Sequence, residues 1–249
     1  MLPFRDYNPS RSFPLITVSI VVLNVLIFLY MVYMNVESGD TALQHFIYRY
    51  SVVPAAFLPA VRLPMPNLQP AVLTLFSAMF LHGGWLHLLG NMLYLWIFGN
   101  NVEDIMGSAR FLAFYLLCGV IATVTYLASV AYVAHTFHNA TILFVPSLGA
   151  SGAIAGVLGA YLVRFPKAQV DTCIFFFIIT VIRLPAILVL AFWFVLQFVN
   201  GISWVSNSKA AMGGGVAVWA HIGGFLAGML LINLFARRDS DVSRDYDSK

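Results

Sequence analysis

The chain has 249 residues, of which 61% are hydrophobic and only 9% are charged. Its mean hydropathy of +0.87 lies far above the range of soluble domains, so the sequence predicts a polytopic membrane protein that uses lipid as its solvent. The formal net charge of +3 is too small to indicate a nucleic-acid partner. Cys118 and Cys173 both lie in apolar runs and indicate neither a disulfide framework nor a metal cluster.

Six apolar segments of the chain are predicted to be transmembrane helices. They cover residues 14–33, 72–98, 111–133, 151–163, 185–200 and 216–236. The first segment is too long for the core of a signal peptide and lacks a small-residue cleavage site, so we expect it to be retained. The predicted fold class is an all-α polytopic membrane protein, with one six-helix transmembrane domain over 1–236 and a polar, disordered cytoplasmic tail over 237–249.

The segments between these helices differ in character. Residues 35–70 are rich in proline and carry scattered charges, which predicts a long first external loop with short interfacial helices. The apolar run at 173–182 has too few residues to span a bilayer, so we assign it to the membrane interface. The helix at 151–163 is unusually short for a span, so its first turn is expected to start inside the bilayer.

Lysine and arginine residues are distributed unevenly across the predicted topology. An even number of helices places both termini on one side of the membrane. That side carries Arg5, Arg11, Arg110, Arg164, Lys167, Arg183, Arg237, Arg238, Arg244 and Lys249, whereas the other side carries only Arg49, Arg62 and Lys209. Because positively charged loops stay on the cytoplasmic side, we expect both termini to be cytoplasmic.

Ser151 lies at the start of a predicted membrane helix, in the sequence Gly-Ala-Ser-Gly at 149–152. The first N–H groups of a helix have no intrahelical partner and lie at the positive end of its dipole, so they can stabilise an anion beside the hydroxyl. This arrangement favours acyl chemistry. The alternative is a serine N-cap followed by a small-residue packing face.

Ser151, Asn91 and His221 are predicted to lie at similar depths in the membrane. Counting ~1.5 Å per residue from the nearest charged flank places them about 18 to 24 Å above the cytoplasmic boundary, within a hydrocarbon core ~30 Å thick. Polar side chains are costly there unless they face a cavity or one another. We therefore expect the three side chains to converge.

The residues after His221 indicate which helix it faces. Gly224 and Gly228 share a helical face with it and form a small-residue stripe, which matches a second stripe beginning at Gly152. Packing these stripes together would place His221 beside Ser151, as a base within reach of a nucleophile. A histidine that only links two helices is the alternative.

His87 and Asn91 lie four residues apart on one helical face, and both can donate hydrogen bonds to a developing oxyanion. A metal site is disfavoured because the sequence has no His-Glu-x-x-His motif, no intramembrane carboxylate and no cysteine nearby. Glu103 and Asp104 lie too close to the cytoplasmic end to orient His221. The residues therefore predict a Ser-His dyad that needs no metal or other cofactor.

At these positions the sequence resembles the rhomboid family of intramembrane serine proteases, in its prokaryotic-type six-helix form. The matching motifs are Gly-Ala-Ser-Gly at 149–152, Ala-His-Ile-Gly-Gly-Phe-Leu-Ala-Gly at 220–228, His-Gly-Gly-Trp-Leu-His-Leu-Leu-Gly-Asn at 82–91 and Glu-Asp-Ile-Met-Gly at 103–107. The resemblance runs from about Thr74 to Phe235.

The resemblance implies a six-helix fold in which Ser151 attacks a peptide bond and His221 acts first as base and then as acid. The implied oxyanion hole consists of His87, Asn91 and the backbone N–H groups of Ser151 and Gly149. The fifth helix and the loop before the sixth would form a moving gate and cap. The cap would include Met212, as a plug over the site, and a hinge formed by Gly213, Gly214 and Gly215.

One position departs from the family pattern. Some members stack an aromatic ring from the fourth helix against the catalytic histidine, but this chain has Ala155 one turn after Ser151. Packing or a ring from elsewhere must therefore orient His221. The sequence does not say which.

The predicted function is an intramembrane serine endopeptidase that cleaves single-span transmembrane substrates near the outer face of a bacterial or archaeal cell membrane. Its partners would be these substrates and the lipid bilayer, and the oligomeric state is left open. The alternative is a rhomboid-like pseudoprotease that binds transmembrane helices without cleaving them. A small transporter is disfavoured because the sequence shows neither an inverted repeat nor further buried ion-pairing charges.

Overall fold

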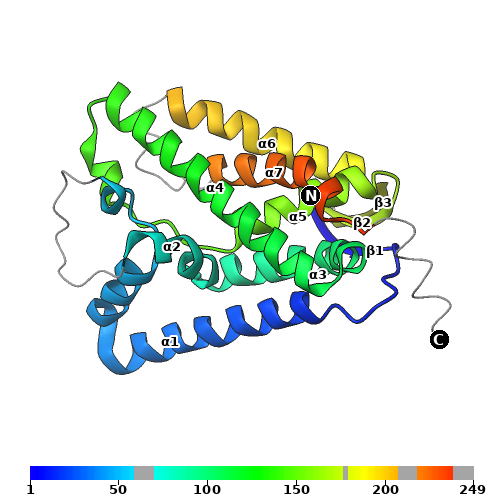
Figure 1. Cartoon of the computed structure of the whole chain (residues 1–249), viewed down its shortest axis with the longest axis horizontal. Coiled ribbons are helices and arrows are strands. Elements are labelled where there is room, and N and C mark those ends of the chain that lie inside the picture. Colours follow the sequence, from blue (N-terminus) through cyan, green and yellow to red (C-terminus); the bar gives the residue numbers. More distant parts are fainter. Residues whose placement is uncertain (59–69, 176–178, 207–217, 238–249) are drawn as a thin grey trace.

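The computed structural model describes residues 1–58, 70–175, 179–206 and 218–237. In these ranges the chain forms a bundle of helices with a small antiparallel sheet at one end, and α1 (Leu15–Tyr50) and α6 (Ala186–Ser206) lie along opposite sides of the bundle (Figure 1). Almost all of the predicted tail lies outside the described residues. So do the candidate gate residues Met212, Gly213, Gly214 and Gly215.

The remaining elements follow in chain order. The other α-helices are α2 (Ala71–Ser77), α3 (Trp85–Met106), α4 (Ser108–Thr136), α5 (Ser151–Arg164) and α7 (Val218–Phe235). The short 3₁₀ helices are η1 (Pro54–Phe57), η2 (Ala78–Phe80) and η3 (Ala140–Phe144). The strands are β1 (Leu2–Asp6), β2 (Gln169–Phe175) and β3 (Ile179–Pro185).

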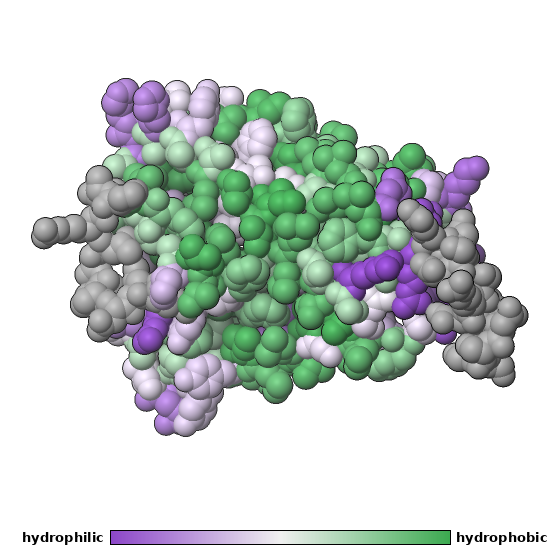
Figure 2. Space-filling view, in the orientation of Figure 1, coloured by the Kyte–Doolittle hydropathy of each residue, from purple (hydrophilic) through white to green (hydrophobic). Residues whose placement is uncertain are grey.

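The helices confirm a polytopic membrane fold. Within the described residues, α1, α4, α6 and α7 are each long and apolar enough to cross a bilayer, and α2–η2 together with α3 pass the same test as a pair bent by 83°. The 14 residues of α5 extend only about 21 Å, less than a hydrocarbon core of ~30 Å. The count of six spans therefore stays a prediction. Figure 2 shows apolar residues across the middle of one face and hydrophilic residues toward both ends, as lipid requires.

Several helices differ from their predicted extents, and α3 and α6 continue to Met106 and Ser206, past the predicted ends at 98 and 200. α1 continues to Tyr50, so the first part of the predicted external loop is helical, and the chain bends inside α1 at Gly39, whose φ of 78° favours glycine. The helix expected over 72–98 is interrupted between η2 and α3. The interruption includes the glycine pair at 83–84, and glycine is a poor helix former.

The described residues of the run at 173–182, assigned to the interface from its length, belong to two antiparallel strands. β2 pairs antiparallel with β3 on one side and with β1 on the other, which gives the strand order β1-β2-β3. Valine, isoleucine and threonine are frequent in this stretch, and such β-branched residues suit a strand. The purely helical prediction was therefore wrong here, because hydropathy does not reveal a pairing as distant as Leu2 with Cys173.

The short helix α5 is the most enclosed helix of the bundle. Its residues from Gly152 to Tyr161 are all buried. The helix approaches α7 through glycines, and a Cβ atom at Gly224 or Gly228 would overlap the backbone carbonyl of Gly152 or Gly156, respectively. This contact agrees with the predicted packing of two small-residue stripes, and it sets the register between α5 and α7.

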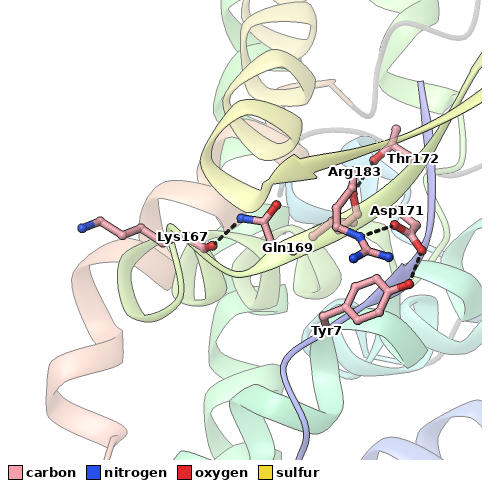
Figure 3. Close-up of polar contacts among 7 residues, drawn as sticks. Tyr7, Lys167, Gln169, Asp171, Thr172 and Arg183 are labelled. Carbon is pink, nitrogen blue, oxygen red and sulfur yellow. Dashed lines mark hydrogen bonds and ion pairs between the residues drawn. The ribbon is translucent and has the colours of Figure 1, made fainter.

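Charged residues gather at the sheet end of the bundle. Asp171 accepts hydrogen bonds from the Tyr7 hydroxyl at 2.7 Å and from Arg183 Nε at 3.0 Å (Figure 3). The Arg183 guanidinium also lies 3.8 Å from the centroid of the Tyr7 ring. These contacts link β1 to β2 and β3 through side chains as well as through strand pairing. We call these three residues the sheet-end cluster.

Two carboxylates tie the N-terminal segment to the helices. Asp6 Oδ2 accepts hydrogen bonds from the Tyr161 hydroxyl at 2.9 Å and from Asn101 Nδ2 at 2.8 Å. Burial raises the pKa of Asp6 above its ordinary value. Glu103 accepts hydrogen bonds at 2.8 Å from both the backbone N–H and the hydroxyl of Thr17, in the first turn of α1, where the helix dipole favours a negative charge.

Candidate active site

Ser151 and His221 lie in hydrogen-bond contact. Ser151 is the first residue of α5, and its Oγ is 2.8 Å from Nε2 of His221 in α7. The preceding Gly149 has a φ of 129°, a conformation that a residue with a Cβ rarely adopts. The structure thus brings together Ser151 and His221, which the predicted membrane depths and the small-residue stripes both indicated should converge. A hydroxyl within reach of an imidazole nitrogen is the arrangement of a nucleophile and its base.

The other ring nitrogen of His221 has a partner that the sequence analysis missed. Nδ1 lies 3.0 Å from Oε1 of Gln197 in α6. The ring of Trp193, one turn earlier in α6, lies 5.8 Å from the His221 ring between centroids. A signal was present in the sequence, because Gln197 is the only amide or charged residue between positions 186 and 199.

Trp193 supplies the ring that the family pattern led us to look for in α5. Ala155 lines the same cavity as Trp193 and His221, and its small side chain leaves room beside the histidine. The ring therefore comes from a different helix, at an interplanar angle of 41° to the imidazole.

His87 lines the same cavity as Ser151 and His221. A Cβ atom placed on Gly149 would come within 2.8 Å of His87 Nε2 and 3.8 Å of Ser151 Oγ, so the imidazole closely approaches the turn before α5. His87 Nδ1 accepts a long hydrogen bond from the Gly83 N–H at 3.4 Å. That bond leaves Nε2 as the protonated nitrogen, close to the turn at Gly149.

Asn91 lines the same cavity but already has a partner. Its Nδ2 lies 3.0 Å from Nε2 of His82, and both side chains are buried. The His82 and His87 rings meet edge to face at 5.1 Å. His82 therefore positions the Asn91 amide, a role that sequence analysis did not assign to it.

The Gly149 backbone cannot serve as one of the predicted oxyanion donors in this structure. Its N–H donates a hydrogen bond to the carbonyl of Ala78 in η2 at 2.8 Å. The turn at Gly149 thus fastens the start of α5 to η2, and the expected donor is occupied. The Ser151 N–H, in the first turn of α5, has no intrahelical acceptor by its position.

A cavity of about 280 Å³ connects these groups. Its polar lining comes from His87 and Asn91 of α3, Ser151 of α5 and His221 of α7, and Trp193 closes it on the α6 side. The other walls are largely apolar. Among the described residues, no three or more His, Cys, Asp or Glu side chains are grouped so that they could hold a metal ion.

Comparisons with known proteins agree on one family. A family model described as the rhomboid domain matches residues 69–238. Presenilin-associated rhomboid-like protein A, mitochondrial, of Danio rerio is 39% identical over 100 residues, which cover 40% of this chain and 23% of the relative. Rhomboid protein 1, mitochondrial, of Saccharomyces cerevisiae is 28% identical over 179 residues, covering 70% and 45%. RHOMBOID-like protein 1 of Arabidopsis thaliana is 27% identical over 252 residues, covering 94% and 57%.

The chain thus spans less than two thirds of the length of each of these relatives. Two of the three carry the word mitochondrial in their names, which conflicts with the bacterial or archaeal cell membrane expected from the sequence. The multi-pass membrane character does not depend on those names, because it rests on the chain's own helices.

Proposed function

The chain belongs to the rhomboid family, and from that premise we propose that it is an intramembrane serine endopeptidase that cleaves transmembrane segments of other membrane proteins. One observation carries the proposal: Ser151 Oγ lies 2.8 Å from His221 Nε2 at the edge of a cavity of about 280 Å³. A serine that only capped a helix would need neither the base nor the space.

In the proposed reaction, His221 Nε2 takes the proton from Ser151 as Oγ attacks the carbonyl carbon of the scissile bond. The resulting imidazolium then protonates the leaving amine, and an acyl-enzyme remains on Ser151. Water, deprotonated by the same nitrogen, attacks the acyl group, and the imidazolium returns its proton to Ser151 Oγ as the second product is released. Both halves of the reaction use one nitrogen and one oxygen, so the pair suffices without a cofactor.

Three donors are positioned to stabilise the oxyanion in this proposal. They are the Ser151 backbone N–H at the positive end of α5, Nε2 of His87 and the amide of Asn91. None of the three carries a full charge in the resting state. Such neutral groups can be held in an apolar region at a much lower cost than ions.

Helical substrates need local unwinding before they can react, because the backbone groups of a transmembrane helix are already hydrogen-bonded. We therefore propose single-span membrane proteins with helix-weakening residues near the membrane surface as substrates.

The N-terminal segment and the end of α7 lie at the same end of the bundle (Figure 1). From the lysine and arginine distribution we propose that this end lies on the side of the membrane that retains positively charged loops.

The proposal is tested with purified protein in proteoliposomes that contain a single-span model substrate. The unmodified chain should cleave the substrate and react with a fluorophosphonate probe, and Ser151→Ala should do neither. Ser129→Ala is the matched control, because the Ser129 hydroxyl is also buried but bonds within its own helix, to the Tyr126 carbonyl. If the unmodified chain binds the substrate helix without cleaving it, the pseudoprotease alternative replaces the protease.

A further inference from the structure

His221 presents two ring nitrogens, and the structure gives each a different kind of partner. Nε2 faces the Ser151 hydroxyl at 2.8 Å, and Nδ1 faces Oε1 of Gln197 at 3.0 Å. A neutral imidazole carries one N–H and one lone pair, so only one of the two nitrogens can accept a proton. Which nitrogen does so decides whether the serine can be activated.

We propose that Gln197 is a positioning residue that holds His221 in the tautomer able to act as a base. This proposal rests on the proposed protease function. The Gln197 carbonyl is an acceptor only, so it pairs with an N–H at Nδ1 and leaves the lone pair on Nε2. In the opposite tautomer Nε2 would itself donate to Ser151, and the hydroxyl proton would have no base to receive it.

The position of Gln197 suits an orienting role and excludes contact with the reacting atoms. It lies on α6, a helix that contributes neither the nucleophile nor the base, and among the residues that line the 280 Å³ cavity α6 is represented by Trp193. Trp193 and Gln197 are four residues apart and share one helical face. One places a ring beside the imidazole, and the other accepts its N–H.

An amide is the side chain expected for this task inside a membrane. A carboxylate would orient the imidazole equally well and would stabilise the imidazolium more strongly, but an ionised carboxylate is costly in an apolar region. Within the described residues, the titratable groups that line the cavity around His221 are His87 and Tyr94, both from α3. Gln197 therefore orients the base without adding a charge to the site.

The test replaces Gln197 with methionine, which has a similar length but cannot accept this hydrogen bond, and with glutamate, which can. In proteoliposomes, Gln197→Met should lower kcat by roughly 10-fold, the effect of one neutral hydrogen bond, and should leave KM nearly unchanged because residue 197 does not contact substrate. Gln197→Glu should restore kcat at alkaline pH. Its carboxylate should also move the pH at which activity rises upward by about one unit or more, because a neighbouring anion favours the imidazolium.

Phe194→Leu is the matched control for packing. Phe194 stacks on Phe225 at 4.7 Å between ring centroids and so joins α6 to α7. The proposal gives Phe194 no role in orienting His221. This variant should keep the pH profile of the unmodified protein. If Gln197→Met keeps kcat within twofold of the unmodified chain, or if the glutamate and methionine variants have the same pH profile, the proposal is wrong.

A measurement without turnover separates this proposal from the proposed function. Nitrogen-15 NMR of histidine-labelled protein in lipid distinguishes a protonated ring nitrogen from a bare one, and a His221→Gln sample identifies the His221 signals by their loss. Nδ1 should be protonated in the unmodified chain, and Gln197→Met should give a mixture of tautomers. An unchanged tautomer in Gln197→Met overturns the role of Gln197. Absence of cleavage by the unmodified chain, with the expected tautomers, would instead overturn the protease.

Discussion

The molecule holds two polar clusters that are built in opposite ways. Ser151, His221 and Gln197 lie among the helices and are joined by hydrogen bonds between groups without fixed charge. The sheet-end cluster instead joins an aspartate and an arginine at 3.0 Å, and the arginine side chain is 54% exposed. The difference follows from the surroundings: hydrocarbon makes an isolated charge expensive, whereas water at the sheet end screens it. The uncharged polar groups of the first cluster therefore lie among the helices, and the charged groups of the second lie at the sheet end.

The comparison predicts that single substitutions have very different consequences in the two places. Among the helices, Ser151 and Gln197 each bond to His221, and the apolar side chains around them offer no substitute for a lost hydrogen bond. In the sheet-end cluster, solvent can take over a lost contact. The following predictions are ordered by expected effect, from the catalytic pair to the surface ion pair.

The largest effect is expected from the Ser151–His221 pair. Either single substitution to alanine should lower kcat by at least about 10⁴-fold, because each removes the covalent route, and the double substitution should be hardly worse than either one. Cleavage of a model substrate in proteoliposomes measures all three rates. Arg183→Gln, in the other cluster, should keep kcat within about twofold. Multiplicative losses in the double variant would show that the two residues act independently.

His221→Ala could also lower stability, since it removes a partly buried side chain. The Tm of each variant should therefore be measured beside its rate. Ser151→Ala should keep the Tm of the unmodified protein, because alanine is compatible with the small-residue packing of α5.

A smaller loss is expected from Asn91. Removing one oxyanion donor typically lowers kcat by about 10²- to 10³-fold, so Asn91→Ala should leave weak but measurable cleavage. The complication is that Asn91 also bonds His82. His82→Ala serves as the control, because it breaks the same bond and retains the amide. If both variants lose equal activity and equal stability, Asn91 has a structural role only.

The meeting of Ser151 and His221 could be predicted from the sequence for a physical reason. In a membrane helix the spacing from a charged flank sets depth, and the stripes at Gly152 and Gly224 allow only one close register between α5 and α7. Depth and register together nearly fix where Ser151 and His221 meet. The helix bundle was predictable on the same grounds, because long apolar segments have few alternatives in lipid.

Gln197 and the sheet escaped prediction because both depend on non-local geometry. The face that α6 turns toward α7 follows from packing that hydropathy does not encode, although a lone amide in an apolar helix was a usable signal. The pairing of β1 with β2 joins Leu2 to Cys173, and neither stretch indicates its partner. The family resemblance implied the Gly149 N–H as an oxyanion donor, but the turn directs it to the carbonyl of Ala78.

Asp6 is titratable, like the sheet-end cluster, but it is partly buried among side-chain donors. Its loss should lower the free energy of unfolding with little effect on kcat. Asp6→Leu leaves the Tyr161 hydroxyl and the Asn101 amide without their shared acceptor, at a cost of about 1–3 kcal/mol in the free energy of unfolding. Thermal unfolding in detergent measures the change. Asp6→Asn is the control, because it retains an acceptor oxygen and lacks the charge.

Comparing the unmodified protein with Asp6→Asn at different pH values gives a further test. Burial raises the pKa of Asp6, so its contribution to stability is fully present below the unfolded-state pKa and is lost as pH rises through the folded-state pKa. The unmodified protein should therefore lose stability relative to Asp6→Asn as the pH rises above the ordinary pKa of aspartate, about 4. The opposite trend would mean that the hydrogen bonds from Tyr161 and Asn101 outweigh the burial of the carboxylate.

The smallest effect is expected at the sheet-end cluster itself. Its contacts lower the pKa of Asp171, first through the Tyr7 hydroxyl and then through Arg183. The Arg183 side chain is 54% exposed, and ion pairs that solvent reaches contribute little. Arg183→Gln should leave the Tm unchanged within error at physiological salt, since strand pairing still holds β3 against β2. Tyr7→Phe, which keeps the ring under the guanidinium and removes only the hydroxyl, should behave alike. A clear drop in Tm from Arg183→Gln that persists at high salt would show that water does not replace the lost contact, and the contrast between the two clusters would then fail.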